Sequence, residues 1–297
     1  MRVFVTGATG FIGSALVPEL IQAGHQVLGM ARSEEGAKAL AAAGAEVHRG
    51  NLEDPETLRS GAAQADGVIH LAFDHDFSNF AAICEKDRHA IEALGAALAG
   101  SNRPLVITSG TGMGSTVPGQ PATEDVFNPD HPNPRSASET AGAALSAAGV
   151  HVSVVRLPQV HDTLKQGLIT PLIALTRSKG VCAYVGEGSN RWPAAHVLDV
   201  ARLYRLALER REAGSRYNAV AEEGVPVREI AEVIGRGLKV PVVSLSGDEA
   251  AAHFGWLAMF AGLDLTASST LTRERLQWRP TGPGLIADLE QMHWVNA

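Results

Sequence analysis

The chain has 297 residues, of which 45% are hydrophobic, and a formal net charge of −7. This length suits one large α/β domain or a domain with a lobe, and the composition excludes wholesale disorder. The negative charge argues against nucleic acid and anionic membranes as partners. No apolar run reaches the roughly 18 residues that cross a bilayer. Met1 leads directly into a predicted strand, so we expect no signal peptide. The only two cysteines have no ligand spacing, so we expect a reducing cytoplasm and no metal site.

The first predicted elements are a strand, a glycine turn and a helix. Residues 2–6 form a short β-branched and aromatic run that predicts a buried strand, and glycines follow at Gly7, Gly10 and Gly13. Gly7 permits the tight turn, Gly10 lets the backbone approach a pyrophosphate, and Gly13 lets helix and strand pack closely. Pro18 falls inside the helix, where we expect a kink, but the helix should survive because its stripe of Ile12, Leu16 and Leu20 faces the sheet.

The residues of this turn, 6–13, read T-G-A-T-G-F-I-G. They resemble the signature of the extended and atypical short-chain dehydrogenase/reductases, the NAD-dependent epimerase/dehydratase-like superfamily that includes sugar-nucleotide epimerases. The resemblance implies an α/β fold, with a Rossmann-type doubly wound parallel sheet and a small C-terminal substrate lobe. It also implies a nicotinamide dinucleotide cofactor. Its contacts at this turn would be Thr6, Gly7, Thr9, Gly10, Phe11, Ile12 and Gly13.

The second predicted strand, residues 26–30, decides which cofactor is expected. An NAD site places Asp or Glu at the end of this strand to bind the ribose 2′-hydroxyl. This chain has Arg32 and Ser33 there, with no carboxylate before Glu34. A guanidinium and a hydroxyl suit a 2′-phosphate, so the residues favour NADP. The alternative is that Arg32 only caps a solvated turn.

Two later loops resemble cofactor segments of the same family. After a helix at 34–43 and a strand at 46–48, residues 50–54 resemble its G-D-L-x-D segment, which places Asn51 and Leu52 at the adenine. The fourth strand, 67–71, runs into a segment that resembles H-L-A-A. It places Leu71, Ala72 and Phe73 beside the nicotinamide ribose, and His70 is interpreted as a core histidine.

The loop after the fourth strand carries Asp74 and His75. It leaves the carboxyl end of a strand, where open α/β sheets bind ligands, so we expect both residues on the substrate side. A metal at this loop is the weaker alternative. The long helix that follows, 79–99, would form a homodimer interface together with a helix at 136–149, from the family resemblance alone.

The fifth strand, 104–108, leads into residues 108–114, which resemble the family's S-S-x-x-V-Y-G segment. Counting back from its last glycine places Ser109 at the catalytic serine, which bonds the reacting oxygen, and Thr111 beside it. An ordinary serine at a strand end is the alternative.

The family's Tyr-x-x-x-Lys pair is missing. On the family's spacing, the tyrosine position falls on His131 and the lysine position on Arg135, and both are retained as catalytic candidates. Pro132 and Pro134 push residues 131–134 toward an extended form, which would separate the two by roughly 12 Å at about 3.1 Å per residue. Arg135, at the start of a helix, is also a cofactor candidate.

The remaining motifs follow the family again. After a strand at 151–156, the segment R-x-x-N-V-Y-G is matched with Leu157 and Pro158 at the cofactor and His161 on the substrate side. The segment G-x-G-x-x-x-R places Arg191 at the substrate. We expect helices at 167–179 and 227–238, a strand at 216–220, and Trp278 in the lobe core or a substrate wall.

These features predict a Rossmann domain over residues 1–156, to which 192–220 return, and a lobe mainly formed by 157–297. The predicted function is NADP-dependent hydride transfer to or from a small carbonyl, alcohol or related substrate, with Ser109 bonding the substrate oxygen. Two alternatives stay open: an NADP-binding redox sensor without catalysis, and a sugar-nucleotide epimerase or dehydratase. The sequence identifies neither the proton source nor the substrate.

Overall fold

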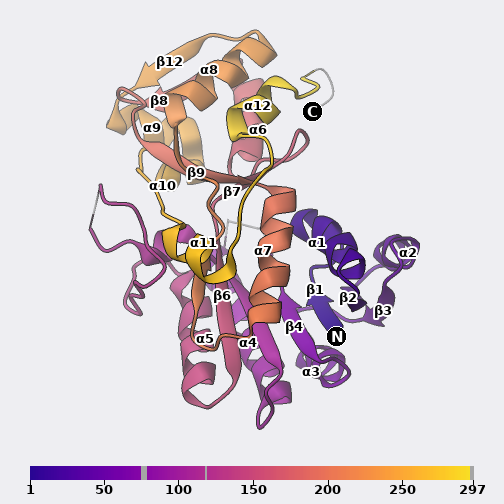
Figure 1. Ribbon diagram of the computed structural model, residues 1–297. Helices are drawn as coiled ribbons and strands as arrows, with labels where there is room; N and C mark the ends of the chain where they lie inside the picture. Colours follow the sequence, from indigo (N-terminus) through magenta and orange to yellow (C-terminus); the bar gives the residue numbers. More distant parts are fainter. Residues whose placement is uncertain (75–78, 118, 295–297) are drawn as a thin grey trace.

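A computed structural model describes residues 1–74, 79–117 and 119–294 (Figure 1). Its largest sheet has seven strands, and every pair of neighbours is parallel. In spatial order the strands are β10 (Arg216–Asn218), β6 (His151–Leu157), β5 (Pro104–Gly110), β4 (Gly67–His70), β1 (Arg2–Thr6), β2 (Gln26–Ala31) and β3 (Glu46–Arg49). The predicted doubly wound parallel sheet is therefore confirmed.

Helices cover both faces of this sheet. One apolar core lies between it and α1 (Phe11–Gln22), α2 (Glu34–Ala42) and α7 (Val197–Arg210). The other core lies under α3 (Pro55–Ala63), α4 (Phe80–Leu98) and α5 (Ser136–Ala147). The α1 helix continues through Pro18, and its stripe residues Leu16 and Leu20 are fully buried, as predicted. No helix in the described ranges is long and apolar enough to cross a membrane.

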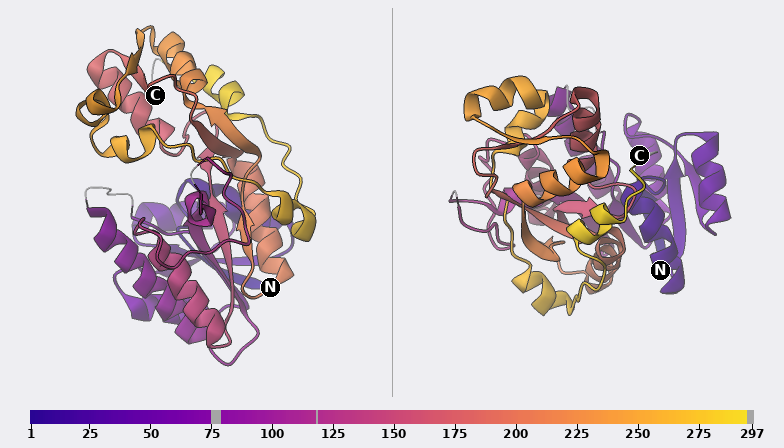
Figure 2. Two further views of the ribbon diagram at one scale, coloured as in Figure 1. Left: turned by 90° about the vertical axis from the view of Figure 1, so that its left-hand side faces the viewer. Right: turned by 90° about the horizontal axis from the view of Figure 1, so that it is seen from above.

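The lobe lies above the carboxyl ends of the central strands (Figure 1; Figure 2, left). It contains a sheet of β7 (Gln159–His161), β9 (Arg191–His196) and β11 (Glu222–Pro226), and the pair β8 (Cys182–Val185) and β12 (Val242–Leu245). Its helical segments are α6 (Ile169–Lys179), α8 (Val227–Leu238), α9 (Gly247–Phe254), η3 (Gly255–Leu257), α10 (Ala258–Ala261) and α12 (Leu285–Glu290). The α8 bounds match the prediction, and Ile230 and Ile234 of α8 are fully buried in the lobe core.

The placement predicted for Trp278 is wrong. After α10 the chain returns to the first domain through α11 (Thr270–Leu276), which packs on α7 and β10, before α12 joins the lobe again. Trp278 is fully buried in the core beside α7, where its Nε1–H donates to the Asp199 carbonyl at 3.0 Å. An aromatic residue signals burial but does not identify its core, and the contact with α7 spans about eighty residues of chain.

Candidate functional site

The register of the central sheet gathers the candidate residues at its carboxyl edge. Thr6 pairs with His70, and His70 with Ile107, across β1, β4 and β5. One strand further, Gly110 pairs with Leu157 of β6. Gly7, Leu71, Ser109 and Pro158 each lie within two residues of one of these positions, so four segments distant in sequence meet at one edge.

The glycine turn has the shape that a pyrophosphate needs. Gly7 has a φ of +66°, and a Cβ there would lie 2.6 Å from the Ala72 nitrogen, so another residue would clash with the loop after β4. A Cβ on Gly13 would lie 2.1 Å from the Gly7 carbonyl oxygen. At Gly10 a Cβ would meet only that same oxygen, at 3.2 Å, so its outer side is open. The open side and the uncapped start of α1 fit an anion at this turn.

The loop after β2 presents one cation to solvent. Arg32 is exposed and has no hydrogen-bond or ion-pair partner among the residues that the structure describes. Ser33 is the N-cap of α2, and its Oγ accepts a hydrogen bond from Gly36 N at 3.1 Å. In the neighbouring loop, Asn51 is exposed and its Oδ1 accepts from Glu53 N at 2.8 Å, while its amide N–H groups point to no described partner.

Ser109 is a buried polar residue near the carboxyl end of β5. Its side chain is 3% exposed, and its Oγ has no hydrogen-bond partner within the described part of the chain. Thr111 is similarly buried, in the short η2 helix (Thr111–Gly114) that follows β5. A buried hydroxyl without a partner costs free energy, so such groups mark places where a water or a ligand supplies the missing bond.

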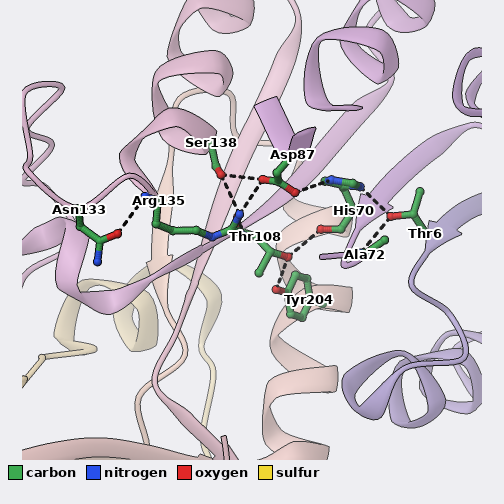
Figure 3. A network of polar contacts seen from close by, with 9 residues as sticks. All are labelled: Thr6, His70, Ala72, Asp87, Thr108, Asn133, Arg135, Ser138 and Tyr204. Atoms are coloured by element: carbon green, nitrogen blue, oxygen red, sulfur yellow. Dashed lines mark hydrogen bonds and ion pairs between the residues drawn. The ribbon is translucent and has the colours of Figure 1, made fainter. Parts of the chain in front are cut away.

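Arg135 lies beside β5 in a buried polar network (Figure 3). Its Nη1 donates to Asp87 Oδ2 at 2.7 Å and to Ser138 Oγ at 2.9 Å, and its Nη2 donates to the Thr108 carbonyl at 2.9 Å. The guanidinium carbon also lies 3.9 Å from the centre of the Phe73 ring. These contacts hold the positive charge of Arg135 against the carbonyl of Thr108, the residue before Ser109.

Asp87 connects this arginine to the first strand. His70 Nε2 lies 3.1 Å from Asp87 Oδ1, and His70 Nδ1 lies 2.7 Å from Thr6 Oγ1 (Figure 3). Both ring nitrogens have partners, which confirms His70 as a core histidine. Burial raises the pKa of Asp87, but the Arg135 charge and the bonds from His70 and Ser138 outweigh it and lower that pKa to about 2.

A tyrosine also reaches the end of β5, although not from the expected segment. The Tyr204 hydroxyl of α7 lies 2.7 Å from Thr108 Oγ1, which in turn donates to the His70 carbonyl at 2.7 Å. Tyr204 is fully buried, and this burial raises its pKa. A hydroxyl in this position supports the strand end and is poorly suited to exchange a proton with a substrate.

Sequence reasoning missed the roles of Asp87, Thr108, Ser138 and Tyr204. One signal was available for Asp87, which lies four residues from both Ile83 and Ile91 on the apolar stripe of α4. A carboxylate on a buried helix face requires a partner. Its partner, Arg135, is 48 residues away, and no local pattern identifies it.

His131 adjoins this network through Asn133, whose Oδ1 accepts a hydrogen bond from Arg135 N at 2.9 Å (Figure 3). Its Nδ1 accepts a hydrogen bond from Asn133 N at 3.1 Å within its own loop. A turn closed by Ser136 N and the Asn133 carbonyl, 3.0 Å apart, covers residues 133–136. The extended form predicted up to Pro134 therefore ends earlier, because Pro134 takes the second position of this turn, which suits its fixed φ.

The substrate-side candidates lie in separate surroundings, and His75 is outside the described residues. Asp74 Oδ2 lies 3.3 Å from Lys86 Nζ. Arg191 pairs with Asp264 at 3.0 Å and is partly exposed. His161 is fully buried, with its Nδ1 2.7 Å from Asp288 Oδ2, and this burial lowers its pKa although Asp288 opposes the shift.

Comparison with known proteins adds to this geometry. A family model described as "NAD dependent epimerase/dehydratase family" matches residues 3–220. An uncharacterised protein of Schizosaccharomyces pombe is 49% identical over 97% of this chain and 98% of its own length. A 2-alkyl-3-oxoalkanoate reductase of Stenotrophomonas maltophilia is 27% identical, over 82% of this chain and 77% of its own. The structure of a dTDP-glucose 4,6-dehydratase from Streptomyces venezuelae with NAD bound matches 99% of this chain and 96% of its own, with a TM-score of 0.77 and 18% identity.

Proposed function

Since the chain belongs to the NAD dependent epimerase/dehydratase family, we propose that it is an NADP-dependent oxidoreductase acting on a small carbonyl, alcohol or related substrate. The observation that carries this proposal is Ser109, a buried hydroxyl that lacks a partner at the carboxyl edge of the sheet. The reductase relative supports the reaction class, since its name describes reduction of an oxo group. We place this activity in the cytoplasm.

The proposed cofactor site consists of the glycine turn, the three loops after β2, β3 and β4, the segment after β6, and Arg135 at the start of α5. Gly10 leaves room for the pyrophosphate, and Arg32 with Ser33 would bind the 2′-phosphate. When bound, the nicotinamide supplies the hydride or accepts it. The residues proposed to hold the cofactor are Thr6, Gly7, Thr9, Gly10, Phe11, Ile12, Gly13, Arg32, Ser33, Asn51, Leu52, Leu71, Ala72, Phe73, Arg135, Leu157 and Pro158.

In this site Ser109 would donate its hydroxyl proton in a hydrogen bond to the substrate oxygen, with Thr111 beside it. Such a donor is most valuable where charge develops on the oxygen during hydride transfer. Arg135 would add a fixed positive charge near the end of β5, because Asp87 and Ser138 hold its guanidinium in one orientation. Asp74, His161 and Arg191 stay predictions as substrate contacts, and His131 stays a minor candidate for the proton donor.

Each alternative function has one observation in its favour. The absence of Tyr-x-x-x-Lys supports a redox sensor without catalysis. Arg135, at the lysine position, is bound to Asp87, and Tyr204 is fully buried, so neither residue replaces the proton transfer of the missing pair. The dehydratase with a similar fold suggests sugar-nucleotide chemistry. Against that reading, Arg191 is already paired with Asp264, so a substrate diphosphate would have to displace this carboxylate.

NADPH is expected to bind at least about tenfold more tightly than NADH, because an arginine–phosphate bond contributes roughly the 1.4 kcal/mol that a tenfold ratio requires. Fluorescence titration of both cofactors against the purified protein measures the ratio. Arg32→Ala should lower the affinity for NADPH and leave that for NADH unchanged. Equal affinities in the wild type would refute NADP as the preferred cofactor, and an Arg32→Ala protein that binds NADPH normally would refute Arg32 as the cause of the preference.

A homodimer is proposed through α4 and α5. Ala144 and Ala148 near the end of α5 are exposed, and small residues allow helices to approach closely. On the exposed face of α4, Arg88 is paired with both Glu85 and Glu92, so only one negative charge of this cluster stays uncompensated. Analytical ultracentrifugation at micromolar concentration should give twice the chain mass of 31.1 kDa. A sedimentation coefficient of a monomer over that range would exclude the dimer.

A further inference from the structure

We propose that Arg49 is a specificity residue that selects NADP over NAD by neutralising Glu34 and binding the 2′-phosphate in its place. Arg49 is the last residue of β3, and the parallel register places it beside Ala31, the last residue of β2. It therefore lies next to the loop that carries Arg32 and Ser33. This inference rests on the proposed use of NADP and names a further residue of that site.

The Arg49 guanidinium has two partners in this loop. Its Nη1 donates to the Ser33 carbonyl at 2.7 Å, and its Nη2 is bonded to the Glu34 carboxylate. Ser33 is the N-cap of α2, and Glu34 is the first residue of this helix. Arg49 thus lies against the backbone of the residue whose hydroxyl and N–H are proposed to meet the 2′-phosphate.

Glu34 is the first carboxylate after β2, and it is the group in this loop that could receive a free ribose 2′-hydroxyl. Its bond to Arg49 occupies the carboxylate and cancels its charge. Together, Arg32 and Arg49 balance Glu34 and Glu35, so the loop is neutral as it stands. Without Arg49 it would carry one net negative charge facing a phosphate monoester of about −1.5 to −2.

The pair is exposed enough to exchange partners. The Arg49 side chain is 50% exposed and the Glu34 side chain 69%, so water screens their attraction and the ion pair is weak. A phosphate carries more charge than a carboxylate and accepts from a guanidinium through two oxygens at once. Arg49 can therefore move from the carboxylate to a 2′-phosphate while it stays close to Ser33.

The test measures dissociation constants of NADPH and NADH by fluorescence titration, without turnover, for four proteins: wild type, Arg49→Met, Glu34→Gln and the double variant. Arg49→Met should weaken NADPH binding by about tenfold or more and strengthen NADH binding, because Glu34 becomes free. In the double variant the NADH gain should disappear, since the amide carries no charge. Arg228→Met serves as the matched control, because it breaks an ion pair of similar exposure with Glu232 in the lobe.

Two results would overturn the inference. Unchanged affinities for both cofactors in Arg49→Met would show that the residue does not reach the cofactor. An equal loss for NADPH and NADH, repeated in Arg49→Lys, would assign it a structural role. Failure of the proposed function is distinguishable from either result, because the wild type itself would then bind NADH as well as NADPH or bind neither.

Discussion

Ser109→Ala is expected to lower the turnover number by about a hundredfold or more, in line with the loss of one oxyanion donor. The side chain is 3% exposed and its hydroxyl has no partner in the described structure, so removing it breaks no internal bond and should leave the fold intact. The affinity for NADPH should stay unchanged, because the hydroxyl is proposed to face the substrate. Steady-state kinetics on a panel of aldehydes and ketones, with parallel NADPH titrations, measure both quantities.

Two further variants make this result specific. Ser153→Ala removes a buried hydroxyl from the neighbouring strand β6, where Ser153 pairs with Val106, and should have little effect on turnover. His131→Phe should also be mild, because the ring is bonded to its own loop. A severe His131→Phe with a nearly silent Ser109→Ala would reverse the assignment. A wild type that binds NADPH tightly but converts no carbonyl, alcohol or imine would favour the redox sensor.

The parts of the fold that the sequence predicted well depend on local patterns. The run at 2–6 became β1, and the segment 227–238 became α8 with the predicted bounds, because periodicity and flanking turns act within a few residues. The glycine turn could also be predicted from the sequence. Gly7 and Gly13 occupy positions where a Cβ would collide with backbone, so the requirement for glycine lies in the chain itself.

The parts that could not be predicted depend on contacts between distant segments. The return of α11 and Trp278 to the first domain depends on their packing against α7 and on the bond from Trp278 to the Asp199 carbonyl, which no periodic pattern encodes. In the same way, Glu34 reads as an ordinary first-turn acid of a helix until the sheet register brings Arg49 beside it. The motifs at the ends of the predicted strands indicated that the site lies at the carboxyl edge of the sheet. The ion pairs between its charged residues could be identified only from the three-dimensional structure.

Asp87→Asn is expected to lower the free energy of unfolding by about 3 kcal/mol or more, since removing one member of a buried ion pair leaves the other uncompensated. Asp87 is 2% exposed, and in the variant Arg135 loses its carboxylate and keeps Ser138, the Thr108 carbonyl and the Phe73 ring, none of which carries a negative charge. Urea denaturation at pH 7 measures the loss. Glu85→Gln on the same helix is the control, because it breaks an exposed pair with Arg88 and should cost at most about 1 kcal/mol.

The pH dependence of the free energy of unfolding shows whether Asp87 stabilises the fold through its negative charge or through the packing of its side chain. Its pKa is lowered from 3.8 to about 2 in the folded protein, so the carboxylate stabilises the fold above pH 4. That contribution is lost as the pH falls from about 4 to about 2 and the group takes up a proton in the folded state. Asp87→Asn should therefore remove part of the acid-induced decline in that window. If the variant followed the wild-type curve at the same stability, Asp87 would not hold Arg135 by its charge, and the position of this cation would have to be explained by its contacts with Ser138, the Thr108 carbonyl and the Phe73 ring.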